Sequence, residues 1–155
     1  MEESGNRPTQ VAVIPVRWRQ GGSVQVCLIR RRTSGRWSIP KGYIDRGHDH
    51  TQAALAEARE EAGLDGRLRG DSIGTYEYDK GPRRLTVAVY VMEVSEERTA
   101  WREMQWRERR WYSVEEAAAL LREHPVEVLY DRLRPVLATM SANAHPASGD
   151  EPRAR

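Results

Sequence analysis

The sequence lacks the features that mark several large classes of protein. It contains one cysteine, Cys27, so no disulfide can form within the chain and we expect a reducing, cytoplasmic setting. No run approaches the roughly 18 apolar residues that a membrane-spanning helix needs. The N-terminus is polar and has no apolar stretch of the kind found in signal peptides. The pattern therefore excludes a disulfide-linked fold and a membrane span.

The composition is typical of one soluble, globular domain. Hydrophobic residues make up 39% of the 155 positions and charged residues 31%, and the net charge is +2. This length supports one hydrophobic core rather than two. From residue 141 onward the sequence turns to alanine, proline, serine, glycine and charge. We expect a flexible start over residues 1–9, a single domain over 10–140 and a disordered tail over 141–155.

Three segments have the pattern of β-strands. Residues 11–16 and 24–29 are apolar and are separated by a glycine turn, and residues 84–94 alternate between two largely apolar faces. The last pattern is typical of a strand that is covered on both sides of a sheet.

The remaining periodic segments predict helices. Residues 51–62 are rich in alanine and follow Asp49, a capping residue. Ser113 and Glu116 form a capping-box pattern that opens a second helix, and residues 126–140 predict a third. The order of elements favours an α/β (α+β) fold in which helices pack on a mixed sheet.

Three glutamates lie near the end of the first predicted helix. At about 100° per residue, Glu57, Glu60 and Glu61 fall within an arc of roughly 100°. Ala53 and Ala54 lie one turn earlier on the same side, so we expect open space above the carboxylates. The residues on nearly the opposite side, which we expect to be buried, are Leu55, Ala58 and Ala62.

These glutamates have no positive neighbours on their own helix. An ordinary exposed acidic face, the alternative interpretation, would place Lys or Arg three or four residues away. Glu57 has only Glu60 and Glu61 at those spacings, and Arg59 points to another side. The helix dipole also disfavours anions in the last turns. A missing counter-charge beside three carboxylates indicates a site for Mg²⁺ or Mn²⁺, which prefer oxygen ligands.

The segment from Gly42 to Leu64 resembles the Nudix box, written G-x5-E-x7-R-E-U-x-E-E-x-G-U, where U is a bulky aliphatic residue. The positions that match in type and spacing are Gly42, Glu57, Glu60, Glu61, Gly63 and Leu64. His48 stands where the first Glu is expected, and Ala56 stands where the Arg is expected. In the family these two residues interact and help to orient the catalytic helix. Since both are replaced together, we expect a different support around the carboxylates.

The resemblance implies a fold, a reaction and a set of ligands. The fold is an α/β/α sandwich around a mixed sheet, with the box as a loop–helix–loop, and the reaction is hydrolysis of a phosphoanhydride bond. Glu57, Glu60, Glu61 and the backbone carbonyl of Lys41 would bind Mg²⁺ or Mn²⁺. Glu61 is our candidate for the carboxylate that activates water, with Glu57 second.

The resemblance extends to a group of enzymes with small, phosphate-rich substrates. The segment from Trp37 to Gly42 is similar to the W-x-x-P-K-G entrance of diphosphoinositol polyphosphate and diadenosine polyphosphate hydrolases. The region from Trp101 to Ala117 resembles the bacterial branch of the diphosphoinositol-type group. The residues that we expect to bind the substrate are Arg30, Arg32, Arg36, Lys41, Gly42 and Arg84. We expect Trp37 and Trp111 to belong to the core rather than to stack on a base.

Several functions remain open at this point. The first is a pyrophosphohydrolase that acts on a diphosphoinositol-type, nucleoside-diphosphate-linked or dinucleoside polyphosphate substrate. The second removes pyrophosphate from the 5′ end of RNA, although no separate RNA-binding segment is visible. The third is a catalytically silent fold that binds a nucleotide or partner, which the altered box suggests. The sequence leaves both a monomer and a homodimer open.

Overall fold

The computed structural model describes residues 7–33 and 35–140. A seven-stranded mixed sheet forms its centre. The strands are β1 (Gln10–Trp18), β2 (Val24–Arg31), β3 (Lys41–Tyr43), β4 (Leu64–Leu68), β5 (Gly74–Lys80), β6 (Arg83–Glu97) and β7 (Arg107–Ser113). Their order is β4-β6-β1-β2-β7, with β3 paired to β1 and β5 paired to β6. β1 and β6 are parallel, and the other pairs are antiparallel.

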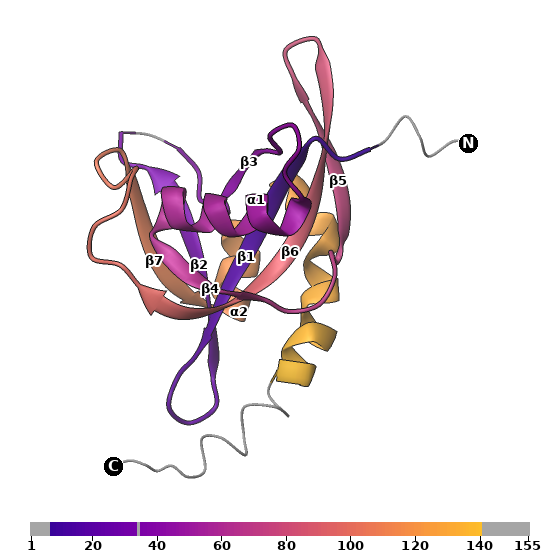
Figure 1. The fold of residues 1–155 in the computed structure, drawn as a ribbon. Helices are drawn as coiled ribbons and strands as arrows, with labels where there is room; N and C mark the ends of the chain where they lie inside the picture. The colour runs from indigo at the N-terminus through magenta and orange to yellow at the C-terminus, as the bar shows by residue number, and fades with distance from the viewer. Residues whose placement is uncertain (1–6, 34, 141–155) are drawn as a thin grey trace.

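Helices cover both faces of this sheet (Figure 1). One face carries α1 (His50–Glu57) and the π-helical segment η2 (Ala58–Ala62) that continues it. The other face carries α2 (Val114–Leu120), the 3-10 helix η3 (Pro125–Arg132) and helical residues 133–140. The predicted α/β/α sandwich with a mixed sheet is confirmed. No helix in the described part of the chain is long and apolar enough to cross a membrane.

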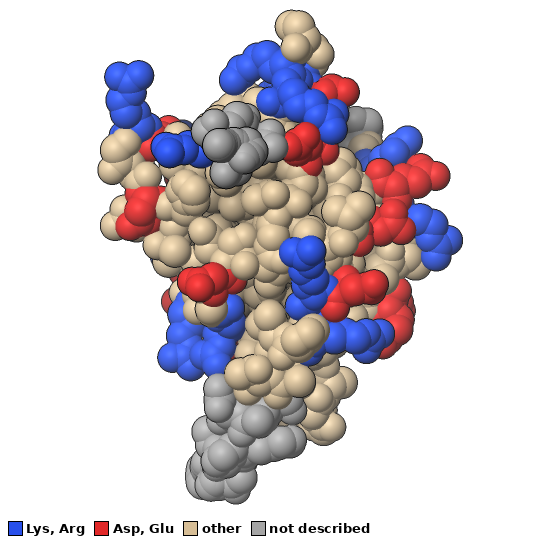
Figure 2. Space-filling view, turned by 90° about the vertical axis from the view of Figure 1, so that its right-hand side faces the viewer, with Lys and Arg blue, Asp and Glu red and all other residues tan. Residues whose placement is uncertain are grey.

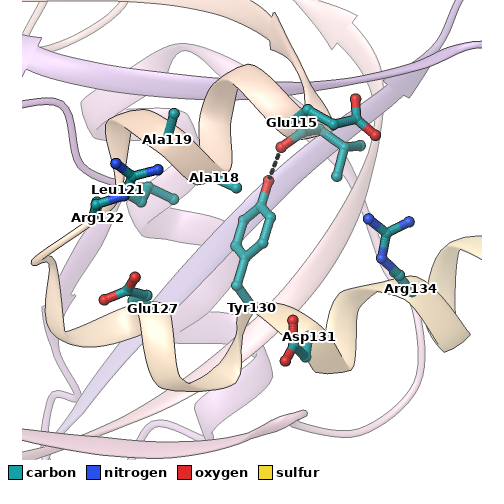
Figure 3. A pocket seen from close by; sticks show the side chains of 10 residues that line it. Glu115, Ala118, Ala119, Leu121, Arg122, Glu127, Tyr130, Asp131 and Arg134 are labelled. Carbon is teal, nitrogen blue, oxygen red and sulfur yellow. Dashed lines mark hydrogen bonds between the residues drawn. The ribbon is translucent and has the colours of Figure 1, made fainter.

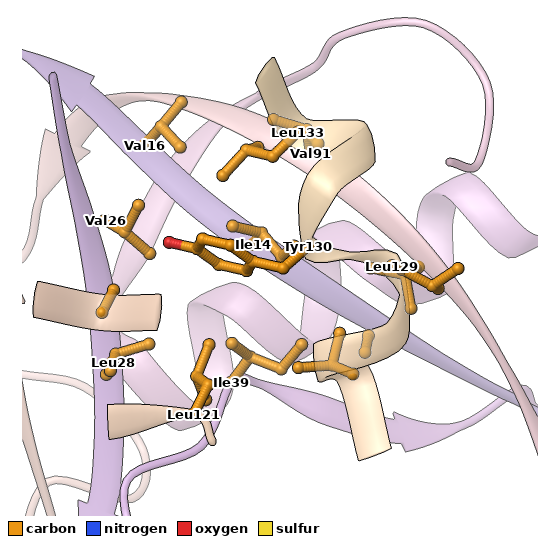
Figure 4. Packing of buried hydrophobic residues seen from close by; sticks show 14 of the residues in the cluster. Ile14, Val16, Val26, Leu28, Ile39, Val91, Leu121, Leu129, Tyr130 and Leu133 are labelled. Atoms are coloured by element: carbon orange, nitrogen blue, oxygen red, sulfur yellow. The ribbon is translucent and has the colours of Figure 1, made fainter. Parts of the chain in front are cut away.

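Each face of the sheet has its own hydrophobic core, because successive strand residues point to opposite faces. Ile14 packs with Tyr130 and Leu133 beneath η3 (Figure 4), whereas Val11 and Val13 pack beneath α1. The β6 residues divide in the same way, with Val87, Val89 and Val91 in the first core and Ala88, Tyr90 and Met92 in the second. The prediction that this strand is covered on both sides is confirmed.

Strand β1 changes its antiparallel partner along its length. Residues 10–12 pair with β3, and residues 16–18 pair with β2. Pro15 lies between the two pairings. On the edge of β1 that faces β3 and β2, Val13 N donates to Pro40 O at 3.0 Å. The nitrogen of Pro15, two residues later, faces the same edge, so proline, which has no N–H to donate, lies at the point where β1 changes partner. The change allows β3 to lie beside β1, next to the end of the carboxylate helix.

The helix that carries the glutamates differs from the predicted one in its second half. Asp49 caps its start as predicted, since its side chain accepts a hydrogen bond from Gln52 N at 2.8 Å. Regular α-helix ends at Glu57, and the last turn is π-helical up to Gly63, whose φ is 67°. A π-helical turn is wider than an α-helical one, so spacing at 100° per residue does not hold over this turn.

The buried side of this helix is also different from the prediction. Ala54, Ala58 and Ala62, at a spacing of four, are completely buried against the sheet. Leu55 is half-buried and packs against the same core, so its placement on the buried side is right in part, whereas the placement of Ala54 on the open side was wrong. Alanine has the smallest apolar side chain, which permits the helix to approach the strands closely.

Other local predictions had mixed outcomes. The capping box of Ser113 and Glu116 is confirmed. The predicted last helix is wrong in its first part, because the chain is 3-10 helical through Arg132 and helical in the ordinary sense only over 133–140. Strands β3, β4 and β5 were not predicted, because most of their residues are only partly buried and give no strong alternation. The proposed domain limits stay a prediction, since residues 1–6 and 141–155 lie outside the described ranges.

Candidate active site

The three glutamates lie where the end of the helix meets β3. Glu61 is 9% exposed, and Glu57 and Glu60 are half-buried. The backbone amide of Lys41 donates to Glu61 Oε1 at 3.1 Å. The Glu57 carboxylate packs directly on Gly42, where a Cβ atom would overlap it. The structure therefore brings the predicted carboxylates together with the backbone of the Lys41–Gly42 segment.

The environment of two of these carboxyls opposes their negative charge. Burial, followed by the charges of Glu61, Glu60 and Glu103, raises the pKa of Glu57 to about 8. Burial also raises the pKa of Glu61 to about 7, although Arg107 and a backbone hydrogen bond act in the opposite direction. Neighbouring groups with strongly raised pKa values are typical of functional sites.

Two of the glutamates have arginine partners that are distant in the sequence. Arg102 Nη1 lies 3.4 Å from Glu60 Oε2, and Arg107 Nη2 lies 3.6 Å from Glu61 Oε2. The expectation of a missing counter-charge was therefore only partly right: the helix provides none, but the segment between β6 and β7 and the start of β7 provide two. Among the described residues, Glu57 has no ion-pair partner.

The same part of the chain supports the end of the helix and adds a fourth carboxylate. Trp101 Nε1 donates to Glu61 O at 3.1 Å, and Arg109 Nη1 donates to Ala62 O at 2.7 Å. Glu103 is one of the charges that face Glu57 and Glu61. Glu103 was not predicted as a site residue, because it lies outside the box and no local spacing connects it with the helix.

A hollow of about 390 Å³ lies beside the carboxylates. Its lining includes Glu57, Glu60, His48 and Ala56, and the last two are the positions at which the box departs from its usual residues. His48 is exposed, and its Nδ1 lies 3.8 Å from a carboxylate oxygen of Asp45. Ala56 has a short side chain at this position, where the usual box residue is an arginine.

The second large cavity has no connection with these carboxylates. It has a volume of about 410 Å³ and lies between α2 and η3, on the opposite face of the sheet (Figure 3). Tyr130 projects into it and donates from Oη to Val114 O at 3.0 Å. Its charged lining residues are of both signs, namely Glu115, Glu127, Asp131, Arg122 and Arg134. None of the predicted site residues lines this cavity.

Three of the predicted phosphate-binding arginines lie at or just beyond the end of β2. Arg30 and Arg32 line a hollow of about 240 Å³. Arg30 Nε donates to Glu108 Oε2 at 2.7 Å, and Arg32 Nε donates to Met104 O at 2.9 Å. The Arg36 side chain is 85% exposed. Each of the first two arginines has one anchored nitrogen and further N–H groups that a phosphate could accept from.

Arg84 belongs to another part of the molecule, the β5–β6 hairpin. It donates to Glu77 Oε1 at 3.1 Å and to Asp79 Oδ1 at 2.9 Å. Figure 2 views the molecule from the side of β5, and Lys and Arg there are interspersed with Asp and Glu. Arg83 instead lies 5.8 Å from the ring centre of Tyr43, a residue that lines the hollow beside the carboxylates. Within this hairpin, Arg83 is therefore the arginine that lies near a residue of the hollow, whereas Arg84 is paired with two carboxylates of its own hairpin.

The side chain of Lys41 points away from the carboxylate that its backbone contacts. Lys41 Nζ donates to Tyr78 Oη at 3.0 Å, and Tyr78 Oη donates to Gln10 Oε1 at 2.7 Å. Tyr78 packs against the core beneath η3 rather than the core beneath α1. Only the backbone of Lys41 therefore contacts Glu61.

The tryptophans behave largely as predicted. Trp37 is 8% exposed and belongs to the core beneath η3. Trp111 is half-buried, packs against the core beneath α1, and donates from Nε1 to Glu97 Oε1 at 3.1 Å. Neither presents an open face for a nucleobase, because Arg30 lies 4.4 Å from the Trp37 ring centre and Arg17 lies 4.1 Å from that of Trp111.

Comparison with known proteins gives a family. A family model described as the NUDIX domain matches residues 7–133. The chain is 33% identical over 116 residues to Nudix hydrolase 21, chloroplastic, of Arabidopsis thaliana, which covers 71% of the chain and 58% of the relative. It is 35% identical over 102 residues to diphosphoinositol polyphosphate phosphohydrolase 3-alpha of Homo sapiens, which covers 64% of the chain and 61% of the relative. The chain thus spans about three fifths of the length of these curated relatives.

Solved structures share the fold. The binary complex of a C. elegans Ap4A hydrolase superposes with a TM-score of 0.71 at 20% identity, over 84% of the chain and 97% of that protein. The Nudix hydrolase RenU from M. smegmatis superposes with a TM-score of 0.61 at 23% identity, over 88% of the chain and 90% of that protein. At these identities the likeness shows the common fold alone.

Proposed function

The chain belongs to the NUDIX domain family, and on this premise we propose that it is a hydrolase that uses a divalent cation to cleave a phosphoanhydride bond in a small, phosphate-rich substrate. One observation carries the proposal. Glu57, Glu60 and Glu61 have the box spacing, lie at one helix end, and meet the backbone of Lys41 and Gly42. Glu57 is half-buried there and has no positive partner among the described residues, an arrangement that a cation would stabilise.

The residues at this place fit Mg²⁺ or Mn²⁺ in their chemistry. Carboxylate oxygens and a backbone carbonyl are hard oxygen donors of the type that both ions prefer. As the side chains stand, no three acidic, histidine or cysteine groups within residues 7–33 and 35–140 are close enough to hold one ion. Glu60 is the carboxylate with the freest movement, because its partner Arg102 is 72% exposed. We therefore assign Glu57 and Glu61 as ligands fixed in place, with Glu60 and the Lys41 carbonyl completing the set.

Each residue has a distinct part in the reaction. A bound divalent cation supplies charge stabilisation at the attacked phosphate and lowers the pKa of bound water. Glu61 accepts the proton of the attacking water, since burial raises the pKa of its carboxyl to about 7, while the Lys41 amide and Arg107 hold the group in place. Glu57 is the second candidate for this role. Arg30 and Arg32 bind phosphate groups of the substrate through the N–H groups that face solvent.

The preferred substrate class is a diphosphoinositol polyphosphate. The human relative carries that substrate in its name, and the W-x-x-P-K-G segment is similar to the same group. The burial of Trp37 removes one aromatic residue that could stack on adenine, whereas Tyr43, which lines the hollow, is 41% exposed, so the preference rests on the relative and the segment. The dinucleoside polyphosphates and the 5′ end of RNA are the alternatives.

A substrate panel tests the proposal. Purified protein with Mg²⁺ or Mn²⁺ is assayed with a diphosphoinositol polyphosphate, diadenosine polyphosphates, nucleotide sugars and triphosphorylated RNA. We expect phosphate release from the first that is abolished by EDTA and retained in Glu96→Gln, a control glutamate that is exposed at the end of β6. Absence of turnover of every compound by folded protein would overturn the enzymatic proposal and favour a binding module.

A further inference from the structure

The box is supported unequally along its length. At the two positions where the box departs from its usual residues, Ala56 and His48 line an open hollow, and the exposed side chain of His48 makes one long contact, to Asp45. Alanine and this exposed histidine do not form an ion pair like that of the usual box. If the carboxylates are to keep one orientation, another part of the chain must hold them.

The backbone at the end of the helix is held from the β7 side. The carbonyl oxygens of four successive residues accept hydrogen bonds from residues 98–109. The bonds are Glu103 N to Glu60 O at 3.1 Å, Trp101 Nε1 to Glu61 O at 3.1 Å, Arg109 Nη1 to Ala62 O at 2.7 Å, and Arg98 N to Gly63 O at 2.8 Å. The last carbonyls of a helix have no partners within it, so these bonds fix the segment that carries the glutamates.

One side chain of this region reaches a carboxylate directly. Arg107 Nη2 lies 3.6 Å from Glu61 Oε2, and Arg107 Nε donates to Glu103 Oε1 at 2.6 Å. The side chains are 18% exposed for Arg107, 11% for Glu61 and 22% for Glu103, so solvent screens these interactions only in part. By contrast, the pair of Arg102 with Glu60 has an arginine that is 72% exposed, and pairs of that kind contribute little.

The remaining oxygen of Glu61 is also occupied, because Oε1 accepts from Lys41 N. The carboxylate therefore accepts a hydrogen bond from β3 at one oxygen and has an ion-pair contact with β7 at the other, and both contacts oppose rotation of its plane. We propose that Arg107, supported by Glu103, is the positioning residue that fixes the Glu61 carboxylate for the cation, in place of the arginine–glutamate pair that this box lacks. This inference rests on the proposed function and adds the residue that orients its site.

The test measures binding of Mn²⁺ by electron paramagnetic resonance, independently of turnover. Arg107→Met removes the charge and retains much of the side-chain volume, and it is expected to weaken Mn²⁺ binding by about tenfold to a hundredfold, the usual effect of removing a group that orients a metal ligand. Arg102→Gln is the matched control, with an expected change below about twofold. Arg107→Lys is expected to fall between, because one ammonium group cannot hold two carboxylates as a guanidinium does. Circular dichroism and thermal melting establish that each variant is folded.

A second variant tests whether the usual arginine–glutamate pair of the box can replace Arg107. His48→Glu with Ala56→Arg restores the usual pair, and in the Arg107→Met background it is expected to recover Mn²⁺ affinity several-fold. In the active enzyme, Arg107→Met should lower kcat with little change in KM, whereas a purely structural role would lower only the melting temperature.

The outcomes separate this inference from the proposed function. Mn²⁺ binding that is equal or stronger in folded Arg107→Met overturns the positioning role, even if the enzyme is active. Failure of the restored pair to recover any affinity overturns the statement that one support stands in place of the other. If the wild-type chain binds no Mn²⁺ that depends on Glu61, the positioning role and the cation site fall together. Mn²⁺ binding that depends on Arg107, with no substrate hydrolysed, supports the positioning role and overturns only the enzymatic proposal.

Discussion

The two ends of the carboxylate helix are held in opposite ways. Its N-terminal end has a cap at Asp49 and follows the exposed His48, which borders the hollow. Its C-terminal end is π-helical and is tied through four successive carbonyls to residues 98–109. The difference agrees with our proposal that a segment distant in the sequence, rather than the box itself, supports the glutamates. Substitutions at the C-terminal end should therefore have larger effects than substitutions at the N-terminal end.

The largest effect is expected for Glu61→Gln. This change retains the shape of the side chain but removes the group that we assign to proton transfer and cation binding. We expect kcat to fall by about 10²-fold to 10⁴-fold, the range for loss of a general base. Steady-state hydrolysis of the best substrate of the panel measures it, with Glu96→Gln as control. Turnover that is undiminished in Glu61→Gln would remove Glu61 from the mechanism.

Gly42→Ala should have the next largest effect. The new Cβ would overlap the Glu57 carboxylate, so either that side chain or β3 must move. We expect Mn²⁺ affinity to fall by about tenfold to a hundredfold, as for other disturbances of ligand orientation.

A double-mutant cycle identifies the cause of that loss. In a Glu57→Ala background the carboxylate is absent, so Gly42→Ala should add no further loss of affinity. An equal further loss in that background would show that Gly42 acts by a route other than Glu57.

Trp101→Phe should have a moderate effect at the tied end. The change removes the hydrogen bond from Nε1 to Glu61 O and keeps an aromatic ring for Arg109, which lies 4.2 Å from the ring centre. We expect the free energy of unfolding to fall by about 1 kcal/mol, the usual net value of one hydrogen bond. Urea denaturation measures it. The control is Trp106→Phe at a 52% exposed position, where we expect less than about 0.5 kcal/mol. Equal losses for the two variants would contradict a specific tie at Trp101.

The smallest effect is expected for His48→Ala, at the other end. The side chain is 59% exposed, and its contact with Asp45 is long. Activity should change by less than about twofold, because exposed substitutions of this type rarely alter stability by more than about 0.5 kcal/mol. A tenfold loss of activity, measured under the same conditions as for Glu61→Gln, would show that the first half of the box still orients the site.

The same division separates what the sequence could predict from what it could not. The glutamates, their contact with the Lys41–Gly42 segment and the sandwich fold were accessible because they depend on local spacing and on a resemblance to a family motif. The hydrophobic pattern also predicted β6, whose two apolar faces lie against separate cores.

Other features depend on contacts between distant residues. Arg107 and Glu103 reach the helix only because β7 pairs with β2 and brings the preceding segment across the sheet. The π-helical turn could not be foreseen either, since its geometry accompanies the ties from residues 98–109 and not a recognisable residue pattern. Spacing along one helix therefore identified the carboxylates but not the residues that orient them.

The most direct test of the account compares the melting temperatures of the wild-type protein and Glu57→Gln, each with and without Mn²⁺. Without the cation, Glu57→Gln should melt a few degrees higher than the wild-type protein, because the substitution removes a half-buried carboxylate that has no positive partner. Addition of Mn²⁺ should raise the melting temperature of the wild-type protein by binding to its folded state, and should raise that of Glu57→Gln much less, so that the order reverses. Equal responses of the two proteins to Mn²⁺, or no response of either, would contradict a cation site built on Glu57.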